Sequence, residues 1–92
     1  MKYQIKRTGK LKKDLKTAIA RGYNMALMDT VVTALSEGRE LDEKYHDYLL
    51  SGDWTGYREC HILPDWLLIY KYNNDDLILY LTRTGSHSDL FK

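Results

Sequence analysis

The spacing of the apolar residues changes once along the chain, and this change constrains the fold more than any other feature. Between residues 10 and 37 apolar side chains recur every three or four positions, as in helices with one buried face. From residue 54 onward they tend to alternate with polar ones, as in half-buried strands. We therefore expect the α+β class, with an antiparallel sheet of about four strands and an N-terminal two-helix hairpin packed on it.

Capping residues delimit the two predicted helices. Thr8 is a suitable N-cap for a helix that runs to about Arg21, and Asn24 for a second helix over residues 25–37. A glycine follows each helix and suits its C-terminal end, and the tight turn between them indicates an antiparallel pair. The methionines of the second helix indicate either an adaptable binding groove or ordinary core. The apolar stripes consist of Leu11, Leu15, Ala18 and Ile19, and of Met25, Met28, Val32 and Leu35.

The predicted strands are short and separated by turn residues. One strand precedes the first helix, and three successive strands near the C-terminus form a meander. Residues 39–53 are expected to be irregular, with Leu49 and Leu50 as apolar anchors, and residues 85–92 to form a short polar tail. No linker or repeat divides the chain, so we expect one domain over residues 1–92. The strands are expected at residues 3–6, 54–60, 66–72 and 77–82.

Composition excludes several classes of protein. No apolar run approaches the ~20 residues that a membrane helix needs, and the N-terminus lacks the apolar core of a signal peptide. Cys60 is the single cysteine, which excludes an internal disulfide and a multi-cysteine zinc site. Three scattered histidines show no paired-ligand spacing. We therefore expect a cytoplasmic protein without a bound metal.

The net charge of +1 conceals two segments of opposite sign. Residues 1–23 hold eight Lys and Arg residues and one acidic residue, a charge of +7, whereas residues 24–92 carry −6. The basic segment suits a polyanion or an acidic partner, and a solvated helix face explains it equally well. The lysines outside the apolar stripe of the first helix are Lys10, Lys12, Lys13 and Lys16.

Histidines are the strongest candidates for acid–base chemistry. His61 follows the first strand of the meander, and Asp65 lies in the next bend. His87 lies beyond the last strand, four residues after Arg83. Adjacent strands of a meander bring these four side chains together. The alternative is that each histidine is an ordinary half-exposed residue at a strand end. The numerous Tyr and Trp rings can stack on RNA bases, although core packing explains most of them.

Two segments carry a specific pattern of residues. Residues 51–70 are SGDWTGYRECHILPDWLLIY, and residues 83–91 are RTGSHSDLF. Together they contain G-x-W-x-G-Y-R-x-x-H-x-x-P-D-W and R-T-G-[ST]-H-x-x-L-F, and in these motifs the chain resembles the YafQ-type toxins of the RelE superfamily. The resemblance covers essentially the whole chain. It implies a RelE-like fold of the microbial-ribonuclease type.

The resemblance also implies an activity. Such proteins are the toxins of type II toxin–antitoxin pairs, and they cut mRNA in the ribosomal A site without a metal or organic cofactor. The general acid for the leaving 5′-oxygen is expected at His87, and Arg83 is expected to pair with the scissile phosphate, which its planar fork of donors suits. His61 and Asp65 are expected to activate the ribose 2′-OH or to hold the nucleotide. The further substrate contacts are expected at Trp66 and Phe91.

One position departs from the family pattern. Members often carry Asp-His where this chain has Asp47 and Tyr48, and that histidine has a catalytic role in the family. A neutral tyrosine has a reference pKa of ~10 and is a poor base at pH 7. Tyr48 can still donate a hydrogen bond to phosphate or stack on a base. His46 lies two residues away, and the role is not transferred to it. The departure leaves the identity of the general base open.

The implied partners are the ribosome, its mRNA and a cognate antitoxin protein. The antitoxin is expected to wrap around a monomeric toxin and to block its site, forming a higher assembly, with an acidic segment on the lysines of the first helix. The departure at Tyr48 favours an alternative function, a catalytically weak or inactive module of the same fold. Such a module acts mainly through antitoxin binding and transcriptional autoregulation.

Overall fold

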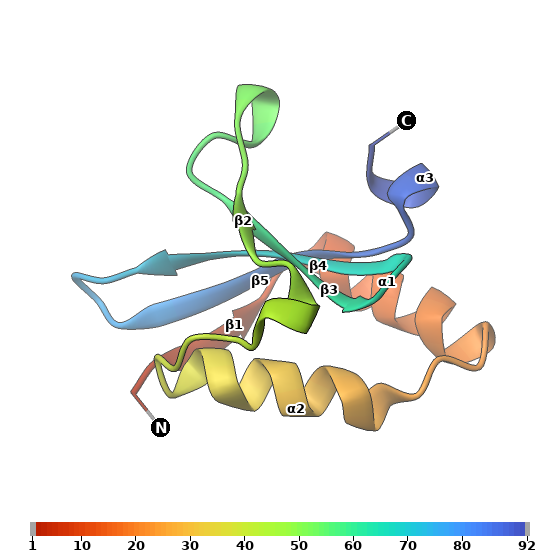
Figure 1. Ribbon diagram of the computed structural model, residues 1–92, viewed down its shortest axis with the longest axis horizontal. Helices are drawn as coiled ribbons and strands as arrows, with labels where there is room; N and C mark the ends of the chain where they lie inside the picture. Colours follow the sequence, from red (N-terminus) through yellow and green to blue (C-terminus); the bar gives the residue numbers. More distant parts are fainter. Residues whose placement is uncertain (1, 92) are drawn as a thin grey trace.

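A five-stranded sheet with the strand order β1-β5-β4-β3-β2 forms the centre of the molecule (Figure 1). The structure, a computed structural model, describes residues 2–91. Within these residues, no helix is long and apolar enough to cross a membrane. The elements are β1 (Gln4–Arg7), α1 (Gly9–Ala20), α2 (Met25–Ser36), η1 (Glu43–Tyr45), β2 (Tyr48–Leu49), η2 (Gly52–Trp54), β3 (Arg58–Leu63), β4 (Trp66–Asn73), β5 (Ile78–Gly85) and α3 (His87–Leu90).

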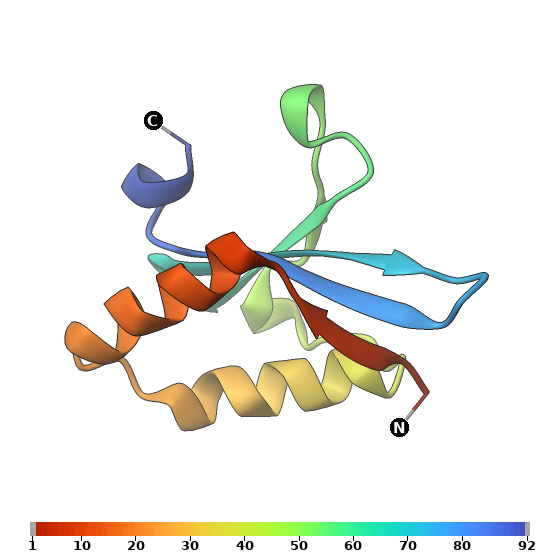
Figure 2. The ribbon, with the colours of Figure 1, turned by 180° about the vertical axis from the view of Figure 1, so that it is seen from behind.

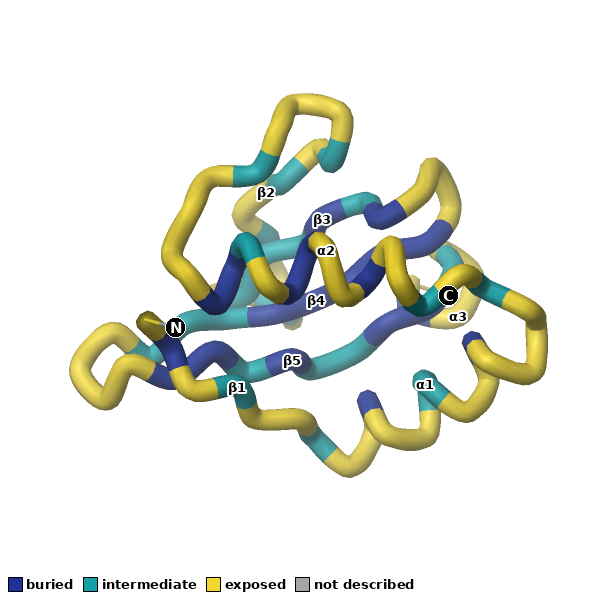
Figure 3. The backbone as a smooth tube through the Cα atoms, turned by 90° about the horizontal axis from the view of Figure 1, so that it is seen from below, coloured by how far each residue is buried: buried dark blue, intermediate teal, exposed yellow. Residues whose placement is uncertain are grey.

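The two long helices begin and end where capping residues predict. The side chain of Thr8 accepts a hydrogen bond from the backbone N–H of Leu11, and that of Asn24 accepts one from Ala26. Gly22, with φ +80°, follows α1 in the left-handed conformation that ends helices. Both helices cover the same face of the sheet (Figure 3), which confirms the predicted hairpin and the α+β class.

The sheet differs from the predicted one in strand number and direction. β1 pairs with β5 in parallel, with Gln4 opposite Ile78 (Figure 2), so the sheet is mixed rather than antiparallel. β2 pairs antiparallel with β3 and adds a fifth strand. Alternation of apolar and polar residues specifies neither the neighbour of a strand nor its direction. β2 has only two residues, which are too few to show the alternation that identifies a strand.

The segments around β3 and after β5 also differ from expectation. β3 begins at Arg58 rather than at residue 54, because η2 and Gly56, with φ +92°, form a turn before it. The expected polar tail contains the short helix α3, which begins with a reciprocal cap. The Ser86 side chain accepts from the Asp89 backbone, and the Asp89 side chain accepts from the Ser86 backbone. α3 and η2 lie on the opposite side of the sheet from α1 and α2 (Figure 1).

Apolar side chains are buried on both faces of the sheet. Alternation along β4 sends Trp66 and Tyr70 to the main cluster beneath the helices, and Leu67 and Ile69 to a second cluster on the other face. Leu90 of α3 belongs to the second cluster, so α3 is anchored to the sheet face away from α1 and α2.

Two expected anchors lie outside both clusters. Ile19, in the last turn of α1, is 62% exposed, and Leu49 is 68% exposed on the edge strand β2. Leu50, the other expected anchor of this segment, packs against the second cluster.

Candidate active site

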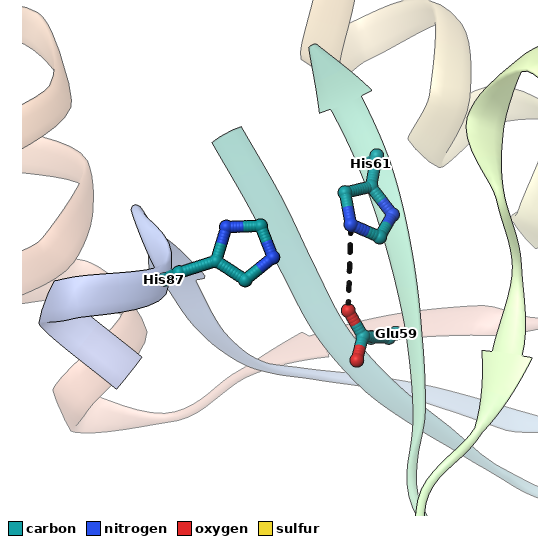
Figure 4. Close-up of side chains that lie close together, drawn as sticks. All are labelled: Glu59, His61 and His87. Carbon is teal, nitrogen blue, oxygen red and sulfur yellow. Dashed lines mark ion pairs between the residues drawn. The ribbon is translucent and has the colours of Figure 1, made fainter. Parts of the chain in front are cut away.

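The candidate catalytic residues lie on the sheet face that carries α3. In β3, Cys60 and Ile62 are buried beneath the helices, so the alternate residues Glu59 and His61 face the other side. His87, the first residue of α3, lies beside them (Figure 4). The ring centroids of His61 and His87 are 5.5 Å apart. The fold thus brings together two of the histidines that the sequence analysis predicted as neighbours.

Asp65 holds His87 through two hydrogen bonds. Its Oδ1 accepts from the backbone N–H of His87 at 3.0 Å and lies 2.7 Å from the imidazole Nδ1. Because a carboxylate can only accept, this contact places a proton on Nδ1 and leaves Nε2 as the reactive nitrogen. The backbone hydrogen bond, followed by that from the imidazole, lowers the pKa of Asp65. Asp65 therefore stays ionised and orients the His87 ring.

His61 is oriented in the same way by a backbone carbonyl. Its Nδ1 lies 3.3 Å from the carbonyl oxygen of His46, which again can only accept a proton. Its Nε2 lies 3.7 Å from Oε2 of Glu59, and the two side chains are 15% and 14% exposed. In the neutral imidazole the Nε2 lone pair is therefore free to accept a proton. His61 and His87 thus both present Nε2 as the chemically available nitrogen.

The sequence analysis did not identify Glu59. The signal was present, because Glu59 and His61 are two residues apart in a strand and therefore share a face. Glutamate is common on exposed strand faces, so this spacing alone does not distinguish a functional carboxylate.

His46 and Tyr48 complete the surroundings of His61. The Nδ1 atom of His46 lies 3.2 Å from the hydroxyl of Tyr48, and its ring centroid is 5.7 Å from that of His61. The Tyr48 ring is 6.3 Å from the His61 ring. The sequence analysis did not transfer the family's catalytic histidine from position 48 to His46. The structure nevertheless places an imidazole beside Tyr48 and His61.

A cavity of about 520 Å³ lies beside this group, between α2, η1 and β3. His46 and His61 contribute its polar side, together with Lys44, and Leu27 and Leu63 contribute apolar surface.

Arg83 is engaged by an acidic residue of α1. Asp14 accepts hydrogen bonds from Arg83 Nε at 2.7 Å and Nη2 at 3.2 Å, and also from the backbone N–H of Thr84. The pKa of Arg83 is raised, mainly by its hydrogen bonds to the Asp14 carboxylate. Arg83 lines a separate polar cavity of about 300 Å³ with Arg21 and Asp89. A phosphate at Arg83 has to use the donors that Asp14 leaves or to displace Asp14.

The two predicted aromatic contacts differ in exposure. Trp66 is 2% exposed, and its indole N–H donates to the hydroxyl of Thr84 at 2.9 Å. No ring face is free for a base, so Trp66 supports the fold rather than a substrate contact. Phe91 is 39% exposed, and its backbone N–H donates to the carbonyl of His87. Phe91 is therefore accessible beside the candidate acid.

The basic residues of α1 are all on its exposed surface. They do not form ion pairs with other described residues, whereas the acid in the same helix, Asp14, is used by Arg83. The residues concerned are Lys10, Lys12, Lys13 and Lys16.

Known proteins are similar to this chain over nearly its whole length. Residues 3–92 match the family model described as "Bacterial toxin of type II toxin-antitoxin system, YafQ". The chain is 40% identical over 88 residues to the mRNA interferase toxin YafQ of Escherichia coli K12, which covers 95% of this chain and 94% of the relative.

Solved structures are similar over nearly the full length. The toxin in the E. coli DinJ–YafQ toxin–antitoxin complex has a TM-score of 0.88 at 38% identity and covers 100% of both chains. A metal-bound toxin from Helicobacter pylori has a TM-score of 0.91 at 39% identity, over 97% of this chain and 99% of that one.

Proposed function

Because the chain belongs to the YafQ family of bacterial toxins of type II toxin–antitoxin systems, we propose that it is an endoribonuclease that cleaves mRNA and thereby inhibits translation. The E. coli relatives are named mRNA interferase toxins. The observation that carries the proposal is the pair of imidazoles, His61 and His87, whose Nδ1 atoms are both occupied by oxygen acceptors.

The two imidazoles suit the two proton transfers of RNA cleavage. His61 Nε2 accepts the proton of the ribose 2′-OH while the 2′-oxygen forms a bond to phosphorus. His87, as the imidazolium, donates its Nε2 proton to the 5′-oxygen as the bond between phosphorus and that oxygen breaks. The products are a 2′,3′-cyclic phosphate and a free 5′-OH. Each positioned proton-transfer group contributes about 10²–10⁴-fold to the rate.

Charged groups around the pair have supporting roles. Asp65 is a positioning residue, because it accepts from the imidazole and the backbone N–H of His87 and contacts the ring rather than the substrate. Arg83 supplies donors for the negative charge on the phosphate, and Phe91 and Tyr48 supply exposed rings for a base. The reaction moves the phosphoryl group from the 5′-oxygen to the 2′-oxygen together with two protons, and an acid, a base and a cation supply the groups that it uses, so the proposed mechanism includes no metal or organic cofactor.

We infer that the ribosome, rather than the charge of the toxin, holds the mRNA at the site. The remainder of the chain after residue 23 carries −6 and cannot hold RNA by bulk charge. We therefore expect the ribosome to present the message in its A site. The exposed lysines of α1 contact ribosomal RNA, and the same basic surface suits an acidic segment of an antitoxin. An E. coli relative is found in complex with the antitoxin DinJ.

The proposal is tested on ribosomes programmed with a defined mRNA. The purified wild-type protein is expected to cleave the message and to leave cyclic phosphate ends. His87→Gln is expected to lower the cleavage rate by about 10²–10⁴-fold. Ser88→Ala changes the adjacent exposed residue of α3 and serves as the matched control, with near wild-type cleavage.

Two results contradict the proposal. Equal cleavage by wild type and His87→Gln, with both proteins melting at the same temperature, removes the assigned acid. Intact message after incubation with the wild-type protein instead favours the alternative, a binding module that acts through its antitoxin, for which Tyr48 is the sequence argument.

A further inference from the structure

A row of alternating lysines and tyrosines crosses the sheet on the face that carries the candidate active site. Lys6 of β1 is opposite Tyr80 of β5, and Tyr80 is opposite Lys71 of β4. Tyr57, directly before β3, lies beside Lys71. We propose that this Lys–Tyr row binds the single-stranded mRNA next to the cleavage site. The choice of mRNA as the bound strand rests on the function proposed above.

Alternation along the strands determines the face on which the Lys–Tyr row lies. The residues on either side of Tyr80, Leu79 and Leu81, belong to the main cluster beneath the helices. Tyr80 therefore faces the other side of the sheet, together with its cross-strand neighbours Lys6 and Lys71. Neither α3 nor η2 extends over the turn of the β4–β5 hairpin (Figure 1, Figure 2). A bound strand can therefore approach the row from this side.

Lys71 presents a positive charge that no described carboxylate neutralises. Its Nζ lies 4.8 Å from the centroid of the Tyr57 ring and 5.6 Å from that of Tyr80. It forms no ion pair with a carboxylate among residues 2–91, although the residue is half-buried. A half-buried ammonium has lost part of its hydration, so an anion beside it is favourable. The two rings hold this charge in the middle of the row, and RNA offers phosphate as the anion.

The order of the side chains fits two unstacked nucleotides. Tyr57 and Tyr80 are two strands apart in the sheet, and at about 4.8 Å between strands they are separated by roughly 10 Å. One stack of bases, with a spacing of ~3.4 Å, does not match this separation. Two splayed bases can each meet one ring, with the phosphate between them at Lys71. A duplex does not offer its base faces, so the row favours a single strand.

The Lys–Tyr row is continuous with the candidate active site. The backbone N–H of Leu50 donates to the carbonyl of Tyr57 at 2.9 Å, so Tyr57 extends the pairing of β2 with β3 by one residue. Tyr57, Glu59 and His61 therefore share one face of the sheet. Tyr57 is four residues from His61, which corresponds to about 13 Å along a strand. A strand of RNA that is cleaved at His61 thus reaches the row within a few nucleotides.

Two acidic side chains limit where the phosphates can lie. Glu59 lies between His61 and Tyr57 on this face, and its carboxylate repels a phosphate there. Asp75, in the turn between β4 and β5, lines the same cavity of about 710 Å³ as Lys71. The phosphate contacts are therefore expected at the lysines of the row rather than along β3 or at the turn.

Binding is measured first, by fluorescence anisotropy of a short uncleavable 2′-O-methyl RNA with the full chain. Tyr57→Leu and Tyr80→Leu each remove one stacking ring and are expected to weaken binding about fivefold or more. Lys6→Gln and Lys71→Gln are each expected to lower the slope of log affinity against log salt by about 0.7. The two readouts distinguish stacking on bases from contact with phosphate.

Matched controls change a similar pair elsewhere or keep the ring. Lys2 also lies over a tyrosine, 5.4 Å from the ring centroid of Tyr3, but Tyr3 belongs to the main cluster on the helix side. Lys2→Gln is therefore expected to leave the salt dependence unchanged. Tyr80→Phe keeps the ring and is expected to bind as the wild type does. NMR spectra verify that each variant is folded, above all Tyr57→Leu, because Tyr57 packs against the second cluster.

Ribosome assays decide whether the bound strand is mRNA. The codon on the 5′ side of the A site is paired with a tRNA, so the free strand continues on the 3′ side. With a long message, Tyr80→Leu is expected to raise the toxin concentration for half-maximal cleavage about fivefold or more and to leave the saturated rate unchanged. With a message that ends at the cleaved codon, the variant and the wild type are expected to cleave alike.

Three results overturn the proposal. Unchanged RNA affinity in the four row variants removes the binding site, and the same variants with weakened antitoxin binding instead identify a protein-binding surface. An equal loss of cleavage on the long and the truncated message identifies a contact with ribosomal RNA. If the wild type cleaves no message at all, the proposed function fails, while anisotropy still decides whether the row binds RNA.

Discussion

Arg21 donates two hydrogen bonds to the carboxylate of Asp89, at 2.6 and 3.2 Å, and thereby connects the end of α1 to the short helix that begins with His87. Asp89 also accepts from the backbone N–H of Ser86 at 2.9 Å. These contacts, with Arg21 first, hold the pKa of Asp89 well below its usual range. The orientation of the candidate acid thus depends on a residue 66 positions earlier in the chain.

Loss of this ion pair is expected to impair catalysis more than folding. Arg21→Gln frees one side of α3, so the position of His87 becomes less defined and kcat falls about tenfold, whereas the melting temperature changes little because exposed pairs contribute little to stability. Single-turnover cleavage over a range of pH, together with thermal melting, measures both effects.

A second exposed pair in the same chain provides the control. Arg39 and Glu37 form an ion pair near the end of α2, and Arg39→Gln is expected to leave kcat unchanged. Equal kcat values for Arg21→Gln and the wild type count against the positioning role, as does a loss of activity matched by an equal loss of folded protein.

The anchorage of α3 is expected to fail only in acid. The pKa values of Asp65 and Asp89 are both lowered from the ordinary value of 3.8, so their ionised forms stabilise the folded state. This contribution is present above about pH 3.8 and is lost as the pH falls through the lower folded-state values. Methyl NMR signals of Leu90, which packs in the second cluster, measure the transition. A midpoint at pH 4 or above contradicts the prediction.

Asp14 and Arg83 are expected to differ in their effects on activity although they form one ion pair. Removing either partner leaves the other charge half-buried, so Asp14→Asn and Arg83→Gln each lower the free energy of unfolding by about 1–2 kcal/mol. Arg83→Gln also removes donors for the phosphate and is expected to lower cleavage by about 10²-fold. Asp14→Asn releases those donors and is expected to cleave as the wild type does.

Urea unfolding and ribosome cleavage assays on the same preparations separate the two roles. If both variants lose activity to the same degree, Arg83 acts through the fold alone.

His46 is expected to compensate for the tyrosine at position 48. His46→Asn removes the imidazole beside Tyr48 and His61 and is expected to lower cleavage about tenfold. Tyr48→His in the same background restores an imidazole at the family position and is expected to recover the activity. Rates for the two single variants and the double variant form a mutant cycle. Wild-type cleavage by His46→Asn excludes the compensation.

The elements that the sequence predicts well are those with local signals. Thr8 and Asn24 cap their helices through contacts within three residues, and alternation identifies four of the five strands within a few positions. The parallel pairing of β1 with β5 depends on the whole topology, and nothing in residues 3–6 encodes it. Ile19 continues an apolar stripe of α1, yet it is exposed, because the stripe of a helix does not show how far along its length the helix is covered.

In the candidate site, too, local sequence signals predict some neighbours, and contacts between distant segments are missed. Strands of a meander lie side by side, which predicts that His61, Asp65, Arg83 and His87 are neighbours. The structure brings His61, Asp65 and His87 together, whereas Arg83 is engaged by Asp14 and lines a separate cavity. The partner of Arg83 is 69 residues away, and no local pattern identifies it. The burial of Trp66 and the approach of His46 to His61 depend likewise on packing between distant segments.

The alternation of side chains along β3 limits how the sequence of this strand can evolve. Cys60 and Ile62 complete the core, and Glu59 and His61 supply chemistry from the same six residues. An insertion or deletion of one residue in this strand exchanges the two sets, so it buries the charged side chains and exposes the apolar ones. The chemistry on β3 can therefore diversify through substitutions at alternate positions, whereas a change in strand length destroys the core together with the site.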